Sequence, residues 1–198
     1  MEALALSSNY LTGLLPANMD AWMNLWYADL GRNNLSGTLS SAFGAMSNMQ
    51  SLFIADNLFS GSLPVLVNLT SMRLFDAGSN IFTGSLPTGM KALAENLWDF
   101  NVADNVLSGA LPLDLLELSN VQLLLLSDNI FSGTIPPGGD LVPGAGQLFA
   151  ANEDNEKETT EAKWSSLKRL KTLKLNGNEL TGSIPPEFLV GLKSTVDM

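Results

Sequence analysis

Six of the eight aspartates in the first two thirds of this sequence recur at related positions of a repeating pattern, and they are the side chains best suited to chemistry. They are Asp29, Asp56, Asp76, Asp99, Asp104 and Asp128. Paired carboxylates could hydrolyse a glycosidic bond if they stood roughly 5–10 Å apart across a cleft. The chain contains no histidine and no cysteine, so the commonest general base, thiol nucleophile and metal ligands are missing. We therefore predict no enzymatic activity, no cofactor and no metal site.

The aspartates have two other interpretations. They could form a surface that selects a basic peptide or protein, or a solvated face that keeps the chain soluble. Aromatic residues form a second group: Trp26, Tyr27, Phe53, Trp98 and Phe149. Aromatic side chains exposed on a rigid face are typical anchors for a peptide or sugar partner. The alternatives are that a shifted strand register places Trp26 or Trp98 in the core, or that these aromatic residues merely cover the sheet.

An internal repeat must position these side chains. Seven similar phrases, such as NLFSGSLP and NIFSGTIP, begin at Asn9, Asn33, Asn57, Asn80, Asn105, Asn129 and Asn178. Their spacings are 24, 24, 23, 25, 24 and 49 residues. Self-similarity at a fixed period of this size predicts a solenoid, in which each coil contacts only its neighbours.

Each repeat begins with a short strand. Apolar residues stand five and three positions before each asparagine, as in Leu52/Ile54 and Phe75/Ala77. This period-two alternation is typical of a strand with one buried face. The asparagine then ends the strand, and its amide is expected to bond backbone groups of neighbouring coils. Further apolar residues, such as Met90/Leu93 and Leu115/Leu118, are expected to reach the same core from the opposite side.

The second half of each repeat contains glycine four residues after the asparagine, and in six of the seven repeats proline follows at seven. Glycine permits close approach, and proline cannot donate to a strand ladder, so we expect a turn or an extended return segment there. Serine or threonine stands three residues after each asparagine. These hydroxyls are expected to bond local backbone at the turn, although a flat array could instead bind ice.

The combined pattern LxxLxLxxNxLxGxLPxxLxxL resembles the leucine-rich repeat of the plant type. The resemblance implies an α/β repeat solenoid, a right-handed superhelix of about eight repeats of 23–26 residues. It places a parallel sheet on the concave side, with loops, 3₁₀ turns or short helices on the convex side. It also implies a recognition module like the ectodomain of a receptor-like kinase or receptor-like protein. Such a module would bind a protein or peptide on its concave face and work outside the cell or at its surface.

The register assigns specific residues to that concave face. Besides the aspartates and aromatics named above, the predicted ligand-binding columns contain Arg32, Arg73, Asn101 and Leu125. Two other functions fit the resemblance: a secreted inhibitor of a cell-wall hydrolase, and an ice-binding or structural repeat protein. Glycosylation sequons occur at Asn34 and Asn68.

We predict one solenoid over residues 1–198, with a degenerate eighth repeat and a polar insertion at about 137–166. Leu148 and Ala150 fit the strand positions of that repeat, and Trp164 and Leu167 are expected to cover its convex side. The insertion is highly charged, which favours a solvated loop or short helix. No cysteine-containing cap is visible at either end, so we expect a fragment of a longer protein. A complete cytoplasmic protein is the alternative.

The charge balance limits the partners. Twenty acidic residues against ten basic ones give a net charge of −10. Such a surface repels phosphate backbones, so nucleic acid is not an expected partner. No apolar run approaches the roughly 18 residues that a membrane span needs, and the first 20 residues lack the pattern of a signal peptide.

Overall fold

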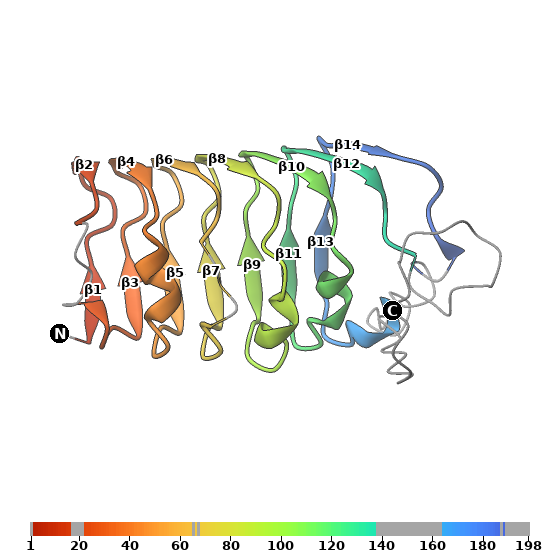
Figure 1. The fold of residues 1–198 in the computed structure, drawn as a ribbon, viewed down its shortest axis with the longest axis horizontal. Coiled ribbons are helices and arrows are strands. Elements are labelled where there is room, and N and C mark those ends of the chain that lie inside the picture. The colour runs from red at the N-terminus through yellow and green to blue at the C-terminus, as the bar shows by residue number, and fades with distance from the viewer. Residues whose placement is uncertain are drawn as a thin grey trace, which may run out of the picture.

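The computed structural model describes residues 2–16, 22–64, 66, 68–137, 164–186 and 188. These residues form a solenoid of seven coils, and each coil contributes one strand to each of two parallel seven-stranded sheets (Figure 1). The predicted leucine-rich-repeat solenoid is thereby confirmed. The number of coils in the described part is one fewer than the approximate number predicted.

The first sheet consists of the strands that the alternating apolar residues predict. They are β1 (Ala3–Ala5), β3 (Tyr27–Asp29), β5 (Ser51–Phe53), β7 (Leu74–Asp76), β9 (Asp99–Asn101), β11 (Leu123–Leu125) and β13 (Thr172–Lys174). The strands pair in this order with equivalent residues opposite each other, as in Leu4, Ala28 and Leu52. From β3 to β11 the middle residue of each strand is buried, because the side chains of a strand alternate between its two faces.

A second parallel sheet occupies the part of each repeat that was expected to turn. Its strands are β2 (Thr12–Leu14), β4 (Asn34–Thr38), β6 (Leu58–Gly61), β8 (Ile81–Gly84), β10 (Val106–Ala110), β12 (Ile130–Thr134) and β14 (Glu179–Thr181). They follow the upper edge of the solenoid in Figure 1. The hydroxyl column therefore lies in strands rather than at turns. Ser36 Oγ donates to the carbonyl of Gly13 on the preceding coil at 3.4 Å, and Thr181 Oγ1 donates likewise to Gly133 at 3.2 Å.

Glycine allows neighbouring coils to approach each other in this second sheet. Gly61 has φ = 75°, a left-handed conformation that side-chain-bearing residues rarely adopt. A Cβ on Gly61 would also stand 2.8 Å from Thr38 Cγ2 on the preceding coil. The repeated glycine thus meets two requirements, a positive φ and a short distance between coils.

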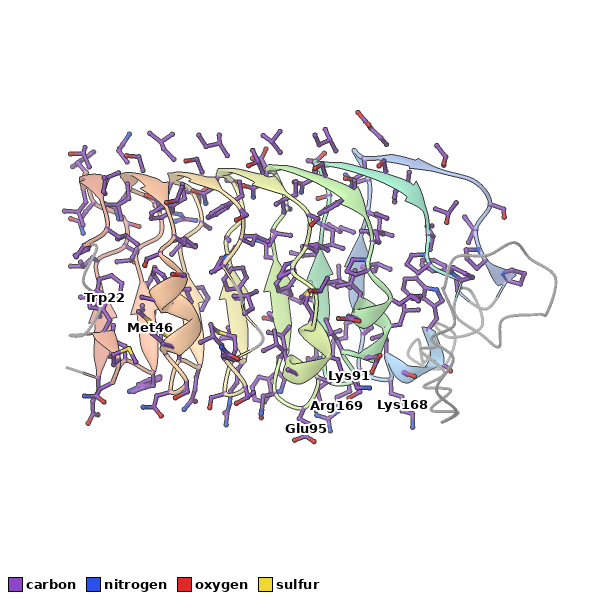
Figure 2. The ribbon with its side chains drawn as sticks, in the orientation of Figure 1. Trp22, Met46, Lys91, Glu95, Lys168 and Arg169 are labelled. Atoms are coloured by element: carbon purple, nitrogen blue, oxygen red, sulfur yellow. The ribbon has the colours of Figure 1, made fainter. Side chains whose placement is uncertain are left out.

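The return segments contain short 3₁₀ helices, as the sequence predicts for the convex side. They are η2 (Ser41–Ala45), η3 (Met90–Leu93), η4 (Leu113–Glu117) and η5 (Trp164–Ser166). Each buries apolar side chains: Met90 and Leu93 of η3 and Leu115 of η4 are almost fully buried. Figure 2 shows Glu95, Lys168 and Arg169 projecting from the turns at the lower edge, whereas the side chain of Met46, beside η2, is completely buried.

The core is continuous along the solenoid axis. Phenylalanines on adjacent coils stack inside it, with ring centroids 5.5 Å apart for Phe75 and Phe100 and 6.3 Å apart for Phe59 and Phe82. Each of these four side chains is almost completely buried. Stacked aromatic pairs add attraction beyond the area that they bury, so they tie consecutive coils together.

A ladder of asparagines bonds the backbone at the bend between the two sheets, as predicted. Asn80 Nδ2 donates to the carbonyl of Ile54 on the preceding coil at 3.0 Å, and to Ala77 and Gly78 on its own coil. Its Oδ1 accepts from the Phe59 N–H at 2.9 Å. In the described part of the chain, every buried side-chain nitrogen or oxygen has a hydrogen-bond partner.

The long interval between Asn129 and Asn178 joins two coils that lie next to each other, because β11 pairs directly with β13. Leu148 and Ala150, the strand positions predicted for the eighth repeat, lie outside the described residues. The Phe131 N–H donates to Asn178 Oδ1 at 3.0 Å, which completes the asparagine ladder across the 49-residue interval. Residues 138–163, which include Phe149 and most of the predicted insertion, lie outside the described residues.

Trp164 and Leu167 are buried, as predicted for the convex side. Trp164 Nε1 donates to the carbonyl of Pro136 at 2.9 Å, and its ring contacts that of Phe188 edge-on at 4.6 Å between centroids. The end of the long interval is therefore fixed to the core on the convex side.

Candidate ligand-binding face

The solvent-facing side of the first sheet, with the turns that follow its strands, is called the concave face below. The structure places the described members of the predicted set outside the core, half-buried or exposed: Trp26, Tyr27, Asp29, Arg32, Phe53, Asp56, Arg73, Asp76, Trp98, Asp99, Asn101, Asp104, Leu125 and Asp128. The side chains of Trp26 and Trp98 are 44% and 39% exposed. The alternative that either tryptophan lies in the core is therefore wrong. Phe149 lies outside the described residues.

The aromatic side chains divide into two groups. Trp26, immediately before β3, forms a continuous row with Tyr27 of β3 and Phe53 of β5, with ring centroids 5.7 Å and 5.8 Å apart. Trp98 stands apart, and the Arg73 guanidinium lies over its ring at 5.3 Å from the centroid. Both groups offer flat apolar surfaces on a sheet whose backbone is fixed by ladder hydrogen bonds.

Three of the six aspartates converge beside Phe53. A shallow cavity of about 230 Å³ lies there, and its lining includes Asp29, Asp56, Asp76 and Arg32. Arg32 Nε lies 3.6 Å from an Asp56 carboxylate oxygen. Asp99, Asp104 and Asp128 do not line this cavity, so the predicted acidic group is also divided.

Backbone and amide donors hold the carboxylates in place. Asp29 Oδ1 accepts from the Gly31 N–H at 3.1 Å. Asp76 Oδ1 accepts from the Gly78 N–H at 3.1 Å and from Asn101 Nδ2 at 2.8 Å. The orientation of both carboxylates is therefore fixed by internal hydrogen bonds.

Burial shifts the ionisation of several groups on this face. It raises the pKa of Asp76, against the opposing effect of the hydrogen bonds from Gly78 and Asn101. Burial also raises the pKa of Asp99, while the charge of Lys171 acts in the opposite direction. The pKa of Tyr27 is raised by burial and then by the adjacent Asp29 carboxylate.

The raised pKa of Asp76 predicts a pH-dependent gain in stability on Asp76→Asn. A carboxyl whose pKa is higher in the folded than in the unfolded state destabilises the fold when it is ionised, and this penalty disappears below both pKa values. We expect Asp76→Asn to melt at a higher temperature than the parent at pH 7. The difference should shrink as the pH falls through the pKa of Asp76. Thermal unfolding at a series of pH values measures this, and a difference that grows toward low pH would contradict the assignment.

Two features of this face were not predicted. The residue before each asparagine is left-handed, with φ from 51° to 57° at Ser8, Arg32, Asp56, Ser79, Asp104 and Asp128. The frequency of Asp, Ser and Gly in this column was a usable signal, because small polar residues tolerate that conformation best after glycine. The second feature is a larger cavity of about 470 Å³, lined by Glu2, Asn24, Trp26, Asn48, Gln50 and Ser71. Of these residues only Trp26 belongs to the predicted set.

No group of three or more acidic side chains, histidines or cysteines in the described part of the chain is arranged to hold a metal ion. None of its helices has the length and apolar character needed to cross a bilayer.

Comparison with known proteins gives sequence relatives among plant receptors. A Leucine Rich Repeat family model matches residues 169–190. Receptor-like protein 35 of Arabidopsis thaliana is 31% identical over 189 residues, which cover 91% of this chain and 20% of the relative. Receptor-like protein 32 of the same plant is 35% identical over 136 residues, covering 68% of this chain and 15% of the relative. The chain thus spans a fifth or less of these relatives.

Solved structures give the same result for the fold. The ectodomain of the Arabidopsis thaliana receptor kinase GASSHO1/SCHENGEN3, in complex with CASPARIAN STRIP INTEGRITY FACTOR 2, matches with a TM-score of 0.79 and 31% identity, over 95% of this chain and 20% of that one. The Arabidopsis receptor kinase HAESA, in complex with the peptide hormone IDA and the co-receptor SERK1, matches with a TM-score of 0.80 and 27% identity. That match covers 99% of this chain and 28% of HAESA.

Proposed function

Given a leucine-rich-repeat solenoid that resembles the ectodomains of plant receptors, we propose that this chain is a non-catalytic recognition module. It binds a peptide or protein segment on its concave face. The observation that carries the proposal is the exposed aromatic row of Trp26, Tyr27 and Phe53, which stands beside the cavity lined by Asp29, Asp56 and Asp76.

The aromatic row supplies the apolar part of such a site. Partly exposed aromatic rings on a rigid backbone bury a large area at a small cost in side-chain entropy, and they dominate many interfaces. Trp98, immediately before β9, offers a second contact together with the Arg73 guanidinium over its ring. In the first sheet, β9 lies two strands beyond β5. A ligand that lies across the strands would contact both groups.

The carboxylates supply charge selection. Asp29, Asp56 and Asp76 line one cavity, and Arg32 is the only cation among its lining residues. A lysine or arginine of the ligand would enter this cavity and form charge-assisted hydrogen bonds with the oriented carboxylates. We therefore propose a ligand with a basic segment, whose association is accelerated by the acidic surface.

The relatives support the class of ligand and the location. HAESA is solved with a peptide hormone, and GASSHO1/SCHENGEN3 with CASPARIAN STRIP INTEGRITY FACTOR 2. By this likeness we place the chain outside the cell or at its surface. Asn34 opens β4 on the second sheet and Asn68 lies in a turn, and both are exposed. Glycans on Asn34 and Asn68 would leave the concave face free.

A selection from random peptides displayed on phage tests the proposal. We expect the purified chain to enrich peptides that combine Lys or Arg with an apolar residue, and salt to weaken their binding. Phe53→Ala should weaken binding about tenfold or more, as loss of a central aromatic contact does. Ile81→Ala, an exposed apolar position on the second sheet, is the matched control and should bind like the parent. If no peptide is enriched, or if selected peptides bind equally to Phe53→Ala, the concave site is wrong.

A further inference from the structure

We infer that the 470 Å³ cavity lined by Glu2, Asn24, Trp26, Asn48, Gln50 and Ser71 is a binding site for a neutral carbohydrate. The cavity lies beside the N-terminal strands of the first sheet, along the edge formed by the turns that precede them. These turns form the lower edge of the solenoid in Figure 1. Its volume falls within the range of ordinary small-molecule sites, about 300–1,000 Å³.

Consecutive coils build the cavity from two columns of side chains. The Trp26 N–H donates to the Glu2 carbonyl at 2.9 Å, and the Gln50 N–H donates to the Trp26 carbonyl at 2.8 Å. Glu2, Trp26 and Gln50 therefore stand at the same position of three neighbouring coils. Asn24, Asn48 and Ser71 come two residues before the equivalent position of their own coils.

The asparagines of the second column are free for a ligand. In later coils the equivalent asparagines bond the preceding turn: Asn96 Nδ2 donates to the Thr70 carbonyl at 2.8 Å, and Asn120 Nδ2 to the Glu95 carbonyl at 2.6 Å. Within the described residues, Asn24 and Asn48 make no such bond, and both are exposed. Their amides can therefore serve a ligand without breaking an internal bond.

The chemistry of the lining matches sugar hydroxyls. A carboxamide both donates and accepts hydrogen bonds, and so does a hydroxyl. Asn24, Asn48, Gln50 and Ser71 therefore offer four neutral groups of mixed polarity. Neighbouring coils stand roughly 4.8 Å apart, so a short oligosaccharide along the edge would meet polar groups on successive coils, namely Asn24, then Asn48 with Gln50, then Ser71.

Trp26 supplies the apolar wall that a sugar ring needs. The C–H groups on the flat face of a pyranose stack on an indole, while its hydroxyls point outward to polar partners. The Trp26 ring is 44% exposed, and Tyr27 supports it at 5.7 Å between centroids. Tyr27 in turn contacts Phe53. The platform is therefore held in position before binding, which lowers the entropy cost.

Charge favours a neutral sugar over a charged ligand. Glu2 is the only ionisable residue among the six that line the cavity, and the chain carries a net charge of −10. An acidic sugar would be repelled. A basic peptide would find more carboxylates in the smaller cavity beside Phe53. An uncharged glucan with equatorial hydroxyls has flat apolar ring faces that suit Trp26. Its neutral hydroxyls suit the amides and the serine of the lining.

Titration with cellotetraose, followed by tryptophan fluorescence and by saturation-transfer NMR, tests the inference. We expect saturable binding with a Kd of about 1 mM, and equal affinity at low and high salt. Trp26→Ala should weaken binding about tenfold or more, and the double variant Asn48→Ala/Gln50→Ala about fivefold or more. Ile81→Ala changes an exposed apolar residue on the second sheet, outside the cavity, and should bind cellotetraose like the parent.

Three results would overturn the carbohydrate site. They are the absence of saturable binding, unchanged affinity in Asn48→Ala/Gln50→Ala, and tighter binding of tetragalacturonate than of cellotetraose. Trp26 also belongs to the proposed peptide face, but the two sites remain distinguishable. Asn48 and Gln50 do not line the cavity beside Phe53, and peptide binding should weaken with salt whereas sugar binding should not.

Discussion

Replacing Asn80 by alanine is expected to lower the free energy of unfolding by about 3–5 kcal/mol. The side chain is 8% exposed and makes four hydrogen bonds. Alanine would leave the N–H of the fully buried Phe59 without its partner. It would also remove one of the two amides that donate to the Ile54 carbonyl, the other being that of Asn57. Each buried group left without a partner costs about 1–3 kcal/mol. Urea unfolding followed by circular dichroism measures the loss.

Asn9→Ala is the matched control for the asparagine ladder. Asn9 occupies the same position of the first coil, but it is exposed, and its Nδ2 donates only to the carbonyls of Leu6 and Ser7 on its own coil. We expect Asn9→Ala to lower the free energy of unfolding by at most about 0.5 kcal/mol, as is typical of a substitution at an exposed position. Equal losses in the two variants would mean that bonding between coils contributes little to stability.

Phe100→Ala is expected to have the second large effect, lowering the free energy of unfolding by about 3–5 kcal/mol. The Phe100 ring is fully buried on β9 and stacks on Phe75 with an interplanar angle of 18°. Removing it leaves a cavity in the middle of a continuous core, and neighbouring backbone held by two sheets cannot collapse to fill it. The same denaturant titration measures this loss.

Phe53→Ala provides the comparison within the same sheet. Phe53 faces solvent and is only half-buried, so the expected loss is about 1 kcal/mol. A cost near that of Phe100→Ala would indicate that the aromatic row of the concave face is part of the folding core. Its assignment to ligand binding would then lose its main support.

The first sheet could be predicted from the sequence because its signal is local. The pair Phe100/Val102 alternates with the polar residues Asp99 and Asn101, and such alternation assigns a buried and an exposed face. The second sheet could not be predicted in the same way. Its strands contain Ser, Gly and Thr, which are typical of turns, and they pair through backbone contacts between coils that lie about two dozen residues apart.

The concave set was also accessible from the register, since every second residue of a strand faces the same side. The register did not predict how that set divides into separate groups. Asp29, Asp56 and Asp76 line one cavity, whereas Asp99 does not. This division depends on the rotamers and spacing of side chains from three coils. The cavity at Trp26 was missed because Asn24 and Asn48 precede the strands, where the repeat gives no rule for orientation.

The interval of 49 residues suggested a hidden coil because its length is twice the repeat. Length alone does not specify pairing, and Asn178 completes the bonds that Phe131 requires from the next coil. The pairing of β13 with β11 therefore depends on contacts between the two coils, which a local sequence pattern does not reveal.

The direct junction of β11 with β13 has a consequence for how such molecules can be altered. The entropic cost of closing a connection rises only with the logarithm of its length, so doubling the span adds about 0.6 kcal/mol. An additional segment of chain can thus be inserted between two adjacent coils while the coils on either side keep their pairing. Lengthening or exchanging that segment gives evolution, or a protein engineer, a way to add a new module without redesigning the solenoid.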